Sequence, residues 1–340
     1  MNPSNAKSFS NLSSPTGGQG AMFRNYFKTA FRSLQRYKSY SIINILGLAI
    51  GIAVCLIIFL IVQFELSFDR FHTKKDRIYR VLTQFNDPTG VSYSAGVPFP
   101  LPRALKNDFP QLEQVAAIYG DNNAQIQVLN ESGGIEKKFK EVTGVFFTQP
   151  SFFEIFDFTW LSGSPITALA EPNSAVLTKE TADKYFGDWK EAIGKTFKRN
   201  NGKTFKVTGI LNDVPKNTDF QFKVIGSYNT LNSSTSDDWV TVNSDNMCYL
   251  LLPQSLTPAI LNRQLVPFVK KYMPADRSTT AHVLQPLSEV HYDSETSNFL
   301  QRTVSKQLIS TLNLIALFIL LIACVNFINL ATAQSINRAK

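Results

Sequence analysis

The sequence predicts an α+β extracytoplasmic domain inserted between two transmembrane α-helices. Three observations carry this prediction: two long apolar runs without charge, basic residues concentrated at the chain ends, and a middle segment in which strand-like and helix-like patterns intermix. The runs cover residues 42–64 and 308–330 of the 340. Residues 65–307, which lie between them, are numerous enough to bury a core of their own.

Each apolar run is long enough to cross a hydrocarbon core of roughly 30 Å as a helix. A buried helix of a soluble protein is the alternative, but such helices seldom stay free of charge over this length. The first run could also belong to a cleaved signal peptide. Its apolar part would then be shorter, and "ELSFDRFH", which follows the run, has no small-x-small cleavage pattern. We therefore expect residues 42–64 and 308–330 to be two membrane spans.

Basic residues concentrate at the two ends of the chain. Six lie before Ile42 and two lie after Ile309, with no acidic residue in either flank, and these eight account for the formal net charge of +8. Cytoplasmic flanks of membrane spans carry an excess of Lys and Arg. Both termini are therefore predicted to be cytoplasmic and residues 65–307 to lie outside. The high pI is explained by this topology, and no nucleic-acid partner is expected, because no basic cluster is interleaved with aromatic residues in the middle segment.

Two different segments precede the first run. Residues 1–21 are rich in Ser, Asn, Gly and Pro, which predicts a disordered leader. Residues 22–41 carry apolar residues at helical spacing beside a row of basic residues, which predicts an amphipathic helix on the inner membrane surface. A plain positive flank that only sets the topology is the alternative. The residues expected to face the inner leaflet are Arg24, Lys28, Arg32 and Arg36.

Within the first run, the stretch "GLAIG" places Gly47 and Gly51 four positions apart. Small residues at this spacing let helix backbones approach closely in membranes. The pattern is common in membrane helices, so it identifies no particular partner. We expect these two glycines to pack the first span against another helix.

The middle segment mixes strand and helix patterns without strict alternation, which predicts an α+β fold. Thr178 is placed to cap a helix that Gly187 ends, and "RNNGK" is typical of a hairpin turn. Residues 299–307 lead into the second run and are expected to form a short stalk helix. "FFTQPSFFEIFDF" is expected to pack in the core around a strand-to-helix turn, with a partner or ligand surface as the alternative. The expected strands are 78–85, 124–130, 138–147, 174–178, 203–211, 220–228 and 248–252, and the expected helices are 99–107, 151–156, 179–186 and 257–272.

No pattern in the sequence indicates catalysis. His72, His282 and His291 are scattered and lack zinc-ligand spacing, and no phosphate-binding glycine-rich loop or G-x-S-x-G turn occurs. Of the three cysteines only Cys248 lies between the runs, so the outer domain cannot form an internal disulfide. We therefore expect no catalytic residue, no cofactor and no bound metal. Two function classes stay open: a transporter subunit, and a membrane-anchored ligand-binding or sensor module, although a sensor would need an output module after the second run.

Several stretches resemble the MacB/FtsX-type ABC-transporter permeases, particularly their Bacteroidetes branch. The resemblance is strongest in "ELSFDRFHTKKDRIYRV", directly after the first run, and in "LNLIALFILLIACVNFINLATAQSINRAK", around the second. It is looser in the middle, through "FFEIFDFTWLSG", "AVLTKETADKYFG" and "TGILNDVP". Altogether it covers about residues 22–340 and implies that residues 65–307 form a MacB-like periplasmic core domain.

The resemblance also implies a place and partners for the chain. It suggests a multi-pass protein of the bacterial inner membrane that works with a separate cytoplasmic ABC ATPase and so is not itself an enzyme. It further suggests a dimer with itself or with a second permease half. The family continues beyond the second span, so residues 331–340 are expected to be the start of a cytoplasmic segment that is interrupted here. Arg338 and Lys340, with the basic residues of 22–41, are expected to face the ATPase or the inner leaflet.

Overall fold

A computed structural model describes residues 24, 28, 38–130, 132–231, 237–273, 280–296 and 298–336. It divides the chain into two compact units, one made of Met1–Val62 with Ser310–Lys340 and the other of Gln63–Ile309. The predicted leader of residues 1–21 lies outside the described residues, as does most of the predicted helix of residues 22–41.

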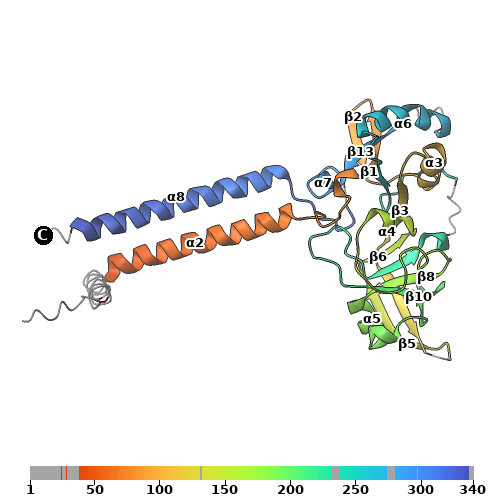
Figure 1. The fold of residues 1–340 in the computed structure, drawn as a ribbon, viewed down its shortest axis with the longest axis horizontal. Coiled ribbons are helices and arrows are strands. Elements are labelled where there is room, and N and C mark those ends of the chain that lie inside the picture. Colours follow the sequence, from red (N-terminus) through yellow and green to blue (C-terminus); the bar gives the residue numbers. More distant parts are fainter. Residues whose placement is uncertain are drawn as a thin grey trace, which may run out of the picture. The chain divides into compact units, whose positions relative to one another are not determined.

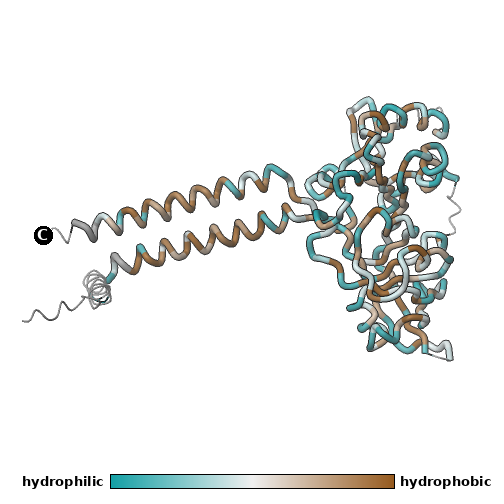
Figure 2. Tube along the Cα trace, viewed as in Figure 1, coloured by the Kyte–Doolittle hydropathy of each residue, from teal (hydrophilic) through white to brown (hydrophobic). Residues whose placement is uncertain are grey.

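The first unit contains most of two long helices, α2 (Lys38–Leu66) and α8 (Lys306–Ile336), which lie side by side (Figure 1). Both are apolar along most of their length (Figure 2). The stretches Ile42–Leu66 and Lys306–Asn329 are long and apolar enough to cross a membrane, and only 6% and 11% of their most apolar windows are buried. Neither is therefore the buried core helix of a soluble domain. These stretches agree closely with the two runs predicted from the sequence.

The two helices run antiparallel. The thiol of Cys55 donates to the carbonyl oxygen of Ala316, while Asn326 Nδ2 donates to the carbonyl oxygen of Asn44, so positions early in one helix face positions late in the other. The less exposed residues of α8 recur at alternating spacings of four and three, the pattern of two helices packed at a small angle. These residues are Ile309, Leu312, Ala316, Ile319, Ala323 and Asn326.

The second unit is built on one mixed sheet. In its described part, thirteen strands are hydrogen-bonded in the order β13-β1-β12-β3-β6-β11-β8-β10-β9-β4-β5, with β2 on β1 and β7 on β10. Most neighbours are antiparallel, but β11 pairs parallel with β6, and β10 pairs parallel with β8. The strands are β1 (Ile78–Asp87), β2 (Gly90–Ser94), β3 (Gln114–Asp121), β4 (Ala124–Leu129), β5 (Ile135–Glu141), β6 (Val145–Thr148), β7 (Trp160–Ser162), β8 (Ser174–Thr178), β9 (Thr196–Arg199), β10 (Thr204–Leu211), β11 (Val224–Ser227), β12 (Asn246–Leu251) and β13 (Thr280–Pro286).

Short helices cover the sheet and divide its core into three apolar clusters. One cluster lies under α3 and α6, a second gathers phenylalanines around α4, and a third lies under α5. Phe152 and Phe156 are fully buried in the second cluster, which confirms the predicted core role of the phenylalanine-rich stretch. The helices are α3 (Leu101–Asp108), α4 (Ser151–Ile155), α5 (Lys179–Phe186), α6 (Pro258–Tyr272) and α7 (Leu287–Val290), with one-turn 3₁₀ helices η1 (Lys75–Arg77), η2 (Trp189–Glu191) and η3 (Tyr228–Thr230).

The local signals predicted from the sequence have clear counterparts. Thr178 accepts a hydrogen bond from the backbone N–H of Thr181, and Gly187 ends α5 with a φ of 88°. The "RNNGK" hairpin joins β9 to β10, and Asn200 and Asn201 take the left-handed conformation that the turn needs. The α+β fold and the four predicted helices are thus confirmed, with boundaries shifted by at most two residues.

Two predictions were wrong. The expected strand over 138–147 is broken into β5 and β6, because Gly144 takes a φ of 95° that no strand accommodates. The expected stalk helix over 299–307 is absent from these described residues, and α8 begins only at Lys306. Ser305 fixes that start, since its hydroxyl accepts a hydrogen bond from the backbone N–H of Leu308.

Candidate functional site

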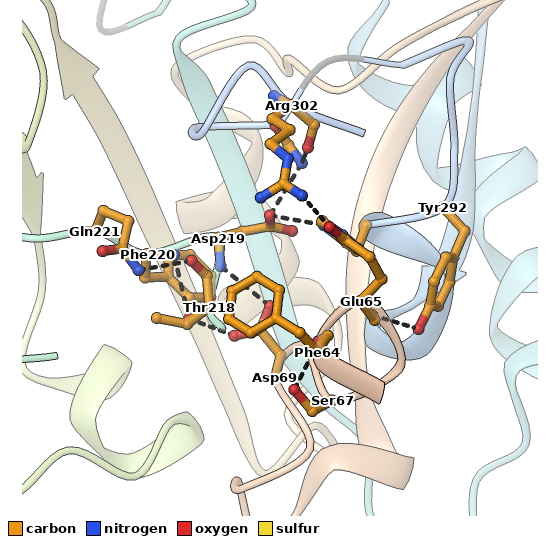
Figure 3. A network of polar contacts seen from close by, with 12 residues as sticks. Phe64, Glu65, Ser67, Asp69, Thr218, Asp219, Phe220, Gln221, Tyr292 and Arg302 are labelled. Atoms are coloured by element: carbon orange, nitrogen blue, oxygen red, sulfur yellow. Dashed lines mark hydrogen bonds and ion pairs between the residues drawn. The ribbon is translucent and has the colours of Figure 1, made fainter. Parts of the chain in front are cut away.

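The candidate site is a buried polar network of the second unit, built around residues 65–73, "ELSFDRFHT", which we call the exit segment. The segment starts in the last turn of α2 and follows the first apolar run without a linker. Besides contacts with residues after α4, its side chains are hydrogen-bonded to two other parts of the outer domain (Figure 3). These are the loop 217–219, which leads toward β11, and residues 291–302, which lead toward α8.

Glu65 anchors the network. Its side chain is only 6% exposed, although it ends in a carboxylate. One carboxylate oxygen forms an ion pair with Arg302, and the other lies 2.8 Å from His291 Nε2. The Tyr292 hydroxyl donates to the backbone carbonyl of the same residue at 3.0 Å. A buried carboxylate is tolerated only when it is paired in this way, so Glu65 and its partners depend on one another.

His291 lies between two carboxylates. Its Nδ1 is 3.4 Å from Asp219 Oδ1, on the opposite side of the ring from Glu65. Phe68 stacks on the imidazole, with ring centroids 3.5 Å apart and planes within 8°. Burial alone would lower the pKa of His291, but the hydrogen bonds to Asp219 and Glu65 outweigh it and raise the pKa. The site therefore favours the imidazolium form, in which both ring nitrogens donate.

Asp69 and Ser67 join the exit segment to the loop 217–219. The backbone N–H of Asp69 donates to the carbonyl oxygen of Asn217 at 3.0 Å, and Asn217 Nδ2 donates to Ser67 Oγ at 2.9 Å. The Thr218 hydroxyl donates to Asp69 Oδ1, and the backbone N–H of Asp219 donates to Asp69 Oδ2 at 3.3 Å. Asp69 takes a φ of 52°, a conformation that Asp tolerates better than most residues. These bonds hold the chain where it leaves α2.

His72 joins the end of the exit segment to the residues after α4. Its Nδ1 accepts a hydrogen bond from the backbone N–H of Asp157 at 3.0 Å. Because Nδ1 accepts, the proton of a neutral ring is on Nε2, which points toward Asp69 at 3.7 Å. Asp157 in turn accepts hydrogen bonds from the backbone N–H and the hydroxyl of Thr73. Five polar side chains thus help to fix the segment to the domain: Glu65, Ser67, Asp69, His72 and Thr73.

This arrangement holds chain segments together. Glu65, Asp219, His291 and Arg302 are engaged with one another, and among its described residues no Ser or Cys nucleophile is activated by a base. Among the residues that the structure describes, no group of three or more His, Cys, Asp or Glu side chains is arranged to hold a metal ion. Removing one partner of a buried pair costs about 3–5 kcal/mol. The network therefore fixes the exit segment firmly within the outer domain.

The sequence-predicted site residues lie elsewhere. A Cβ on Gly51 would lie 3.1 Å from Ala323 Cβ, and a Cβ on Gly47 would lie 3.1 Å from Asn326 Nδ2, so both glycines are on the face of α2 that contacts α8. Arg24 and Lys28 are helical and exposed. The remaining four basic residues lie outside the part of the chain that the structure describes: Arg32, Arg36, Arg338 and Lys340.

Sequence reasoning missed the network itself. It treated His72 and His291 as scattered because they lack zinc-ligand spacing, and they are 219 positions apart in the sequence. One signal was present: "ELSFDRFH" places Glu65, Asp69 and His72 directly after a charge-free run, where a mere exit from the membrane needs no acidic residue. Only the fold shows which distant residues neutralise them.

Comparisons with known proteins agree with this architecture. The model of the MacB-like periplasmic core domain family matches residues 41–282, more than half of the chain. Among solved structures, a domain of a protein described as a permease, from Porphyromonas gingivalis, superposes with a TM-score of 0.53 at 18% identity, covering 63% of this chain and 92% of that one. The periplasmic region of MacB from Actinobacillus actinomycetemcomitans gives a TM-score of 0.42 at 13% identity, covering 62% and 90%. No curated protein matches the chain in sequence.

The family match extends from the start of the first apolar run into β13, so it includes the exit segment and most of the sheet. The likeness to the Porphyromonas domain shows that the outer domain shares its fold with a solved structure. Two apolar helices flank this domain, as fits a protein of the inner membrane with a periplasmic domain. The chain therefore belongs to the MacB/FtsX-type permeases, through its MacB-like periplasmic core domain.

Proposed function

We propose that the chain is the permease subunit, or part of one, of an ABC exporter in which a separate cytoplasmic ATPase drives an outer domain that expels or releases substrate. The observation that carries this proposal is the exit segment, whose residues are bonded into the outer domain directly after a long apolar helix. A helix joined in this way passes its displacement to the domain, whereas a flexible linker would absorb it. The joint is what a mechanically driven exporter requires.

The proposal includes a topology. Both termini are cytoplasmic, α2 and α8 span the inner membrane, and residues 65–307 are periplasmic. The antiparallel pairing of the helices supports this, because it places the start of α2 and the end of α8 at the same end of the pair. The concentration of basic residues in both flanks supports the cytoplasmic assignment of that end.

The proposed partners follow from the same picture. The ATPase and the anionic inner leaflet would meet the basic flanks, which include Arg24 and Lys28, both exposed, and extend to Arg338 and Lys340. The chain would dimerise with itself or with a second permease half, because most apolar side chains of α2 and α8 are exposed outside their mutual contact. Lipid or further helices would cover that surface.

Co-purification tests the proposal. The tagged chain is extracted in mild detergent from cells that contain its genomic neighbours, and bound proteins are identified by mass spectrometry. We expect an ATPase with a phosphate-binding loop among them. The double variant Arg24→Glu with Lys28→Glu should reduce its recovery at least several-fold, because it reverses the charge of the cytoplasmic flank.

A matched control reverses two positive charges of the outer domain instead of the basic flank. Lys138→Glu with Lys140→Glu alters two exposed lysines of β5 and should leave the recovery of the ATPase unchanged. Recovery of no ATPase, together with a soluble ligand bound to the outer domain, would favour the ligand-binding or sensor module instead. Equal loss in both double variants would show that the flank has no specific role.

A further inference from the structure

A cavity of about 200 Å³ lies in the outer domain beside the network of the exit segment. It is lined by residues of three regions: the end of β3 and the start of β6, the start of β12, and the residues 298–301 that lead toward α8. A water molecule occupies about 30 Å³, so the cavity has room for roughly six waters or one small organic molecule. A peptide or a large macrocycle would not fit.

The cavity carries a carboxylate without a partner. Asp245 lines it, and among the described residues no side chain or backbone group donates a hydrogen bond to its carboxylate. Burial raises the pKa of Asp245, and the nearby charge of Asp121 raises it further. Asp121 itself is paired with Arg199, so one negative charge is left over at the cavity. A partly buried, unpaired carboxylate is costly and is the feature a cation would neutralise.

Aromatic and sulfur-containing side chains form the apolar part of the lining. Phe146 and Phe299 meet edge to face, with ring centroids 4.9 Å apart, and Met247 lies beside them. Phe299 packs on Gly120, where a Cβ would lie 3.2 Å from the ring, and the backbone N–H of Gly120 donates to the carbonyl oxygen of Asp245. The rings and the carboxylate therefore come from adjoining parts of one rigid surface. Aromatic faces attract ammonium groups.

We propose that this cavity binds a small organic cation, with its ammonium group on Asp245 and its apolar body against Phe146, Phe299 and Met247. The proposal goes beyond the exporter function, since binding needs neither the ATPase nor transport. It also gives the occupant a way to act on the network. Asn298 lines the cavity, donates to Asp219 Oδ1 at 3.0 Å, and accepts from the backbone N–H of Arg302. A bound molecule would contact Asn298, which holds the backbone of Arg302, and the side chain of Arg302 pairs with Glu65.

Calorimetric titration of the full chain in detergent tests the site. The probe is phenethylamine, and phenethyl alcohol, which has the same body without the charge, is its neutral counterpart. We expect saturable binding of the amine and at least tenfold weaker binding of the alcohol. Asp245→Asn should weaken binding of the amine at least tenfold. The matched control Asp87→Asn removes an exposed charge at the end of β1 and should leave amine binding unchanged.

A second variant keeps the proposal testable if Asp245→Asn fails to fold. Phe299→Leu keeps the carboxylate and removes one ring, and it should weaken amine binding several-fold without changing the thermal unfolding midpoint by more than a few degrees. Absence of saturable binding to the wild type would overturn the proposal. So would equal binding of amine and alcohol, or amine binding that is unchanged in both Asp245→Asn and Phe299→Leu.

Discussion

Glu65 is the residue on which the exit segment depends most, because its one buried carboxylate holds two cations from the segment leading to α8. His291 is 2% exposed, so it cannot replace the lost partner with water. Arg302 is 47% exposed at its side chain and can turn to solvent instead. Substitution of Glu65 should therefore affect stability mainly through the loss of its pairing with His291.

Glu65→Gln keeps the shape of the side chain and removes its charge. We expect the free energy of unfolding of the outer domain to fall by about 1–3 kcal/mol, because a buried charge-assisted hydrogen bond is weakened and His291 loses one of two carboxylates. Urea or thermal unfolding followed by tryptophan fluorescence measures the change.

The control for Glu65 is Glu289→Gln. Glu289 also pairs with a cation near the start of α8, Lys306, but both side chains are substantially exposed. Such a pair contributes at most about 1 kcal/mol. Equal effects of the two substitutions would mean that burial of Glu65 adds nothing, and the mechanical role of the network would then be wrong.

Two histidines of the outer domain should respond to pH with opposite sign. Because the folded-state pKa of His291 is raised above about 6.5, the stability it contributes is fully present below that pH and is lost as the pH rises through the folded value. Burial lowers the pKa of His282 to about 4, so its contribution is present above about 6.5 and is lost as the pH falls toward 4.

Unfolding midpoints measured from pH 4 to 9 for the wild type, His291→Gln and His282→Gln check this expectation. The difference between the wild type and His291→Gln should shrink from pH 6 to pH 9. The difference between the wild type and His282→Gln should shrink from pH 6.5 to pH 4. Parallel pH curves for the wild type and His291→Gln would contradict a charged imidazole in the network.

At the scale of elements, the contact of α2 with α8 depends on small residues. A side chain at Gly51 would meet Ala323 and Ile319, whereas Ala53 is exposed away from the contact. Gly51→Leu should therefore push the helices apart, and overpacking of this kind costs about 1–3 kcal/mol. Ala53→Leu adds a side chain of the same final size and should be tolerated.

Disulfide cross-linking reports the helix contact directly. Cys55 bonds to the carbonyl oxygen of Ala316, so Ala316→Cys should form a disulfide with it when Cys248 and Cys324 are replaced by Ala. We expect Gly51→Leu to reduce the yield of this disulfide several-fold and Ala53→Leu to leave it unchanged. If the yield is the same in both, the glycines are not what brings the helices together.

The elements that the sequence predicted well are those with local signals. α5 has its own cap and stop, and the hairpin between β9 and β10 has its own turn residues. β3 and β13 were missed because their identity depends on neighbours that are distant in the sequence: β3 lies between β12 and β6, and β13 pairs with β1 in the described part of the sheet. Residues 299–305 do not form the expected helix, because Asn298 binds the backbone carbonyl of Arg302 and Ser305 caps the start of α8 only after them.

At the scale of the whole molecule, the sequence predicted the architecture because two charge-free runs and an uneven charge distribution are properties of the chain as a whole. The network could not be predicted in the same way. Glu65, Asp219 and His291 are brought together by the fold, and an isolated acidic residue near a span has several possible roles. The family resemblance identified the exit segment as characteristic, and the structure supplies the physical reason.

At this scale the membrane topology is the prediction that can be tested. The antiparallel helices require that residues before α2 and residues at the end of α8 lie on one side of the membrane, and the basic flanks predict that this side is the cytoplasm. In a background with Cys55, Cys248 and Cys324 replaced by Ala, a cysteine is introduced at Ser92, which is exposed on β2, or at Ser335. An impermeant thiol reagent should label the first in intact spheroplasts and the second only after lysis. If both cysteines are labelled without lysis, the antiparallel arrangement of the helices is wrong. If only the cysteine at Ser335 is labelled without lysis, the helix pair stands but the orientation inferred from the basic flanks is reversed.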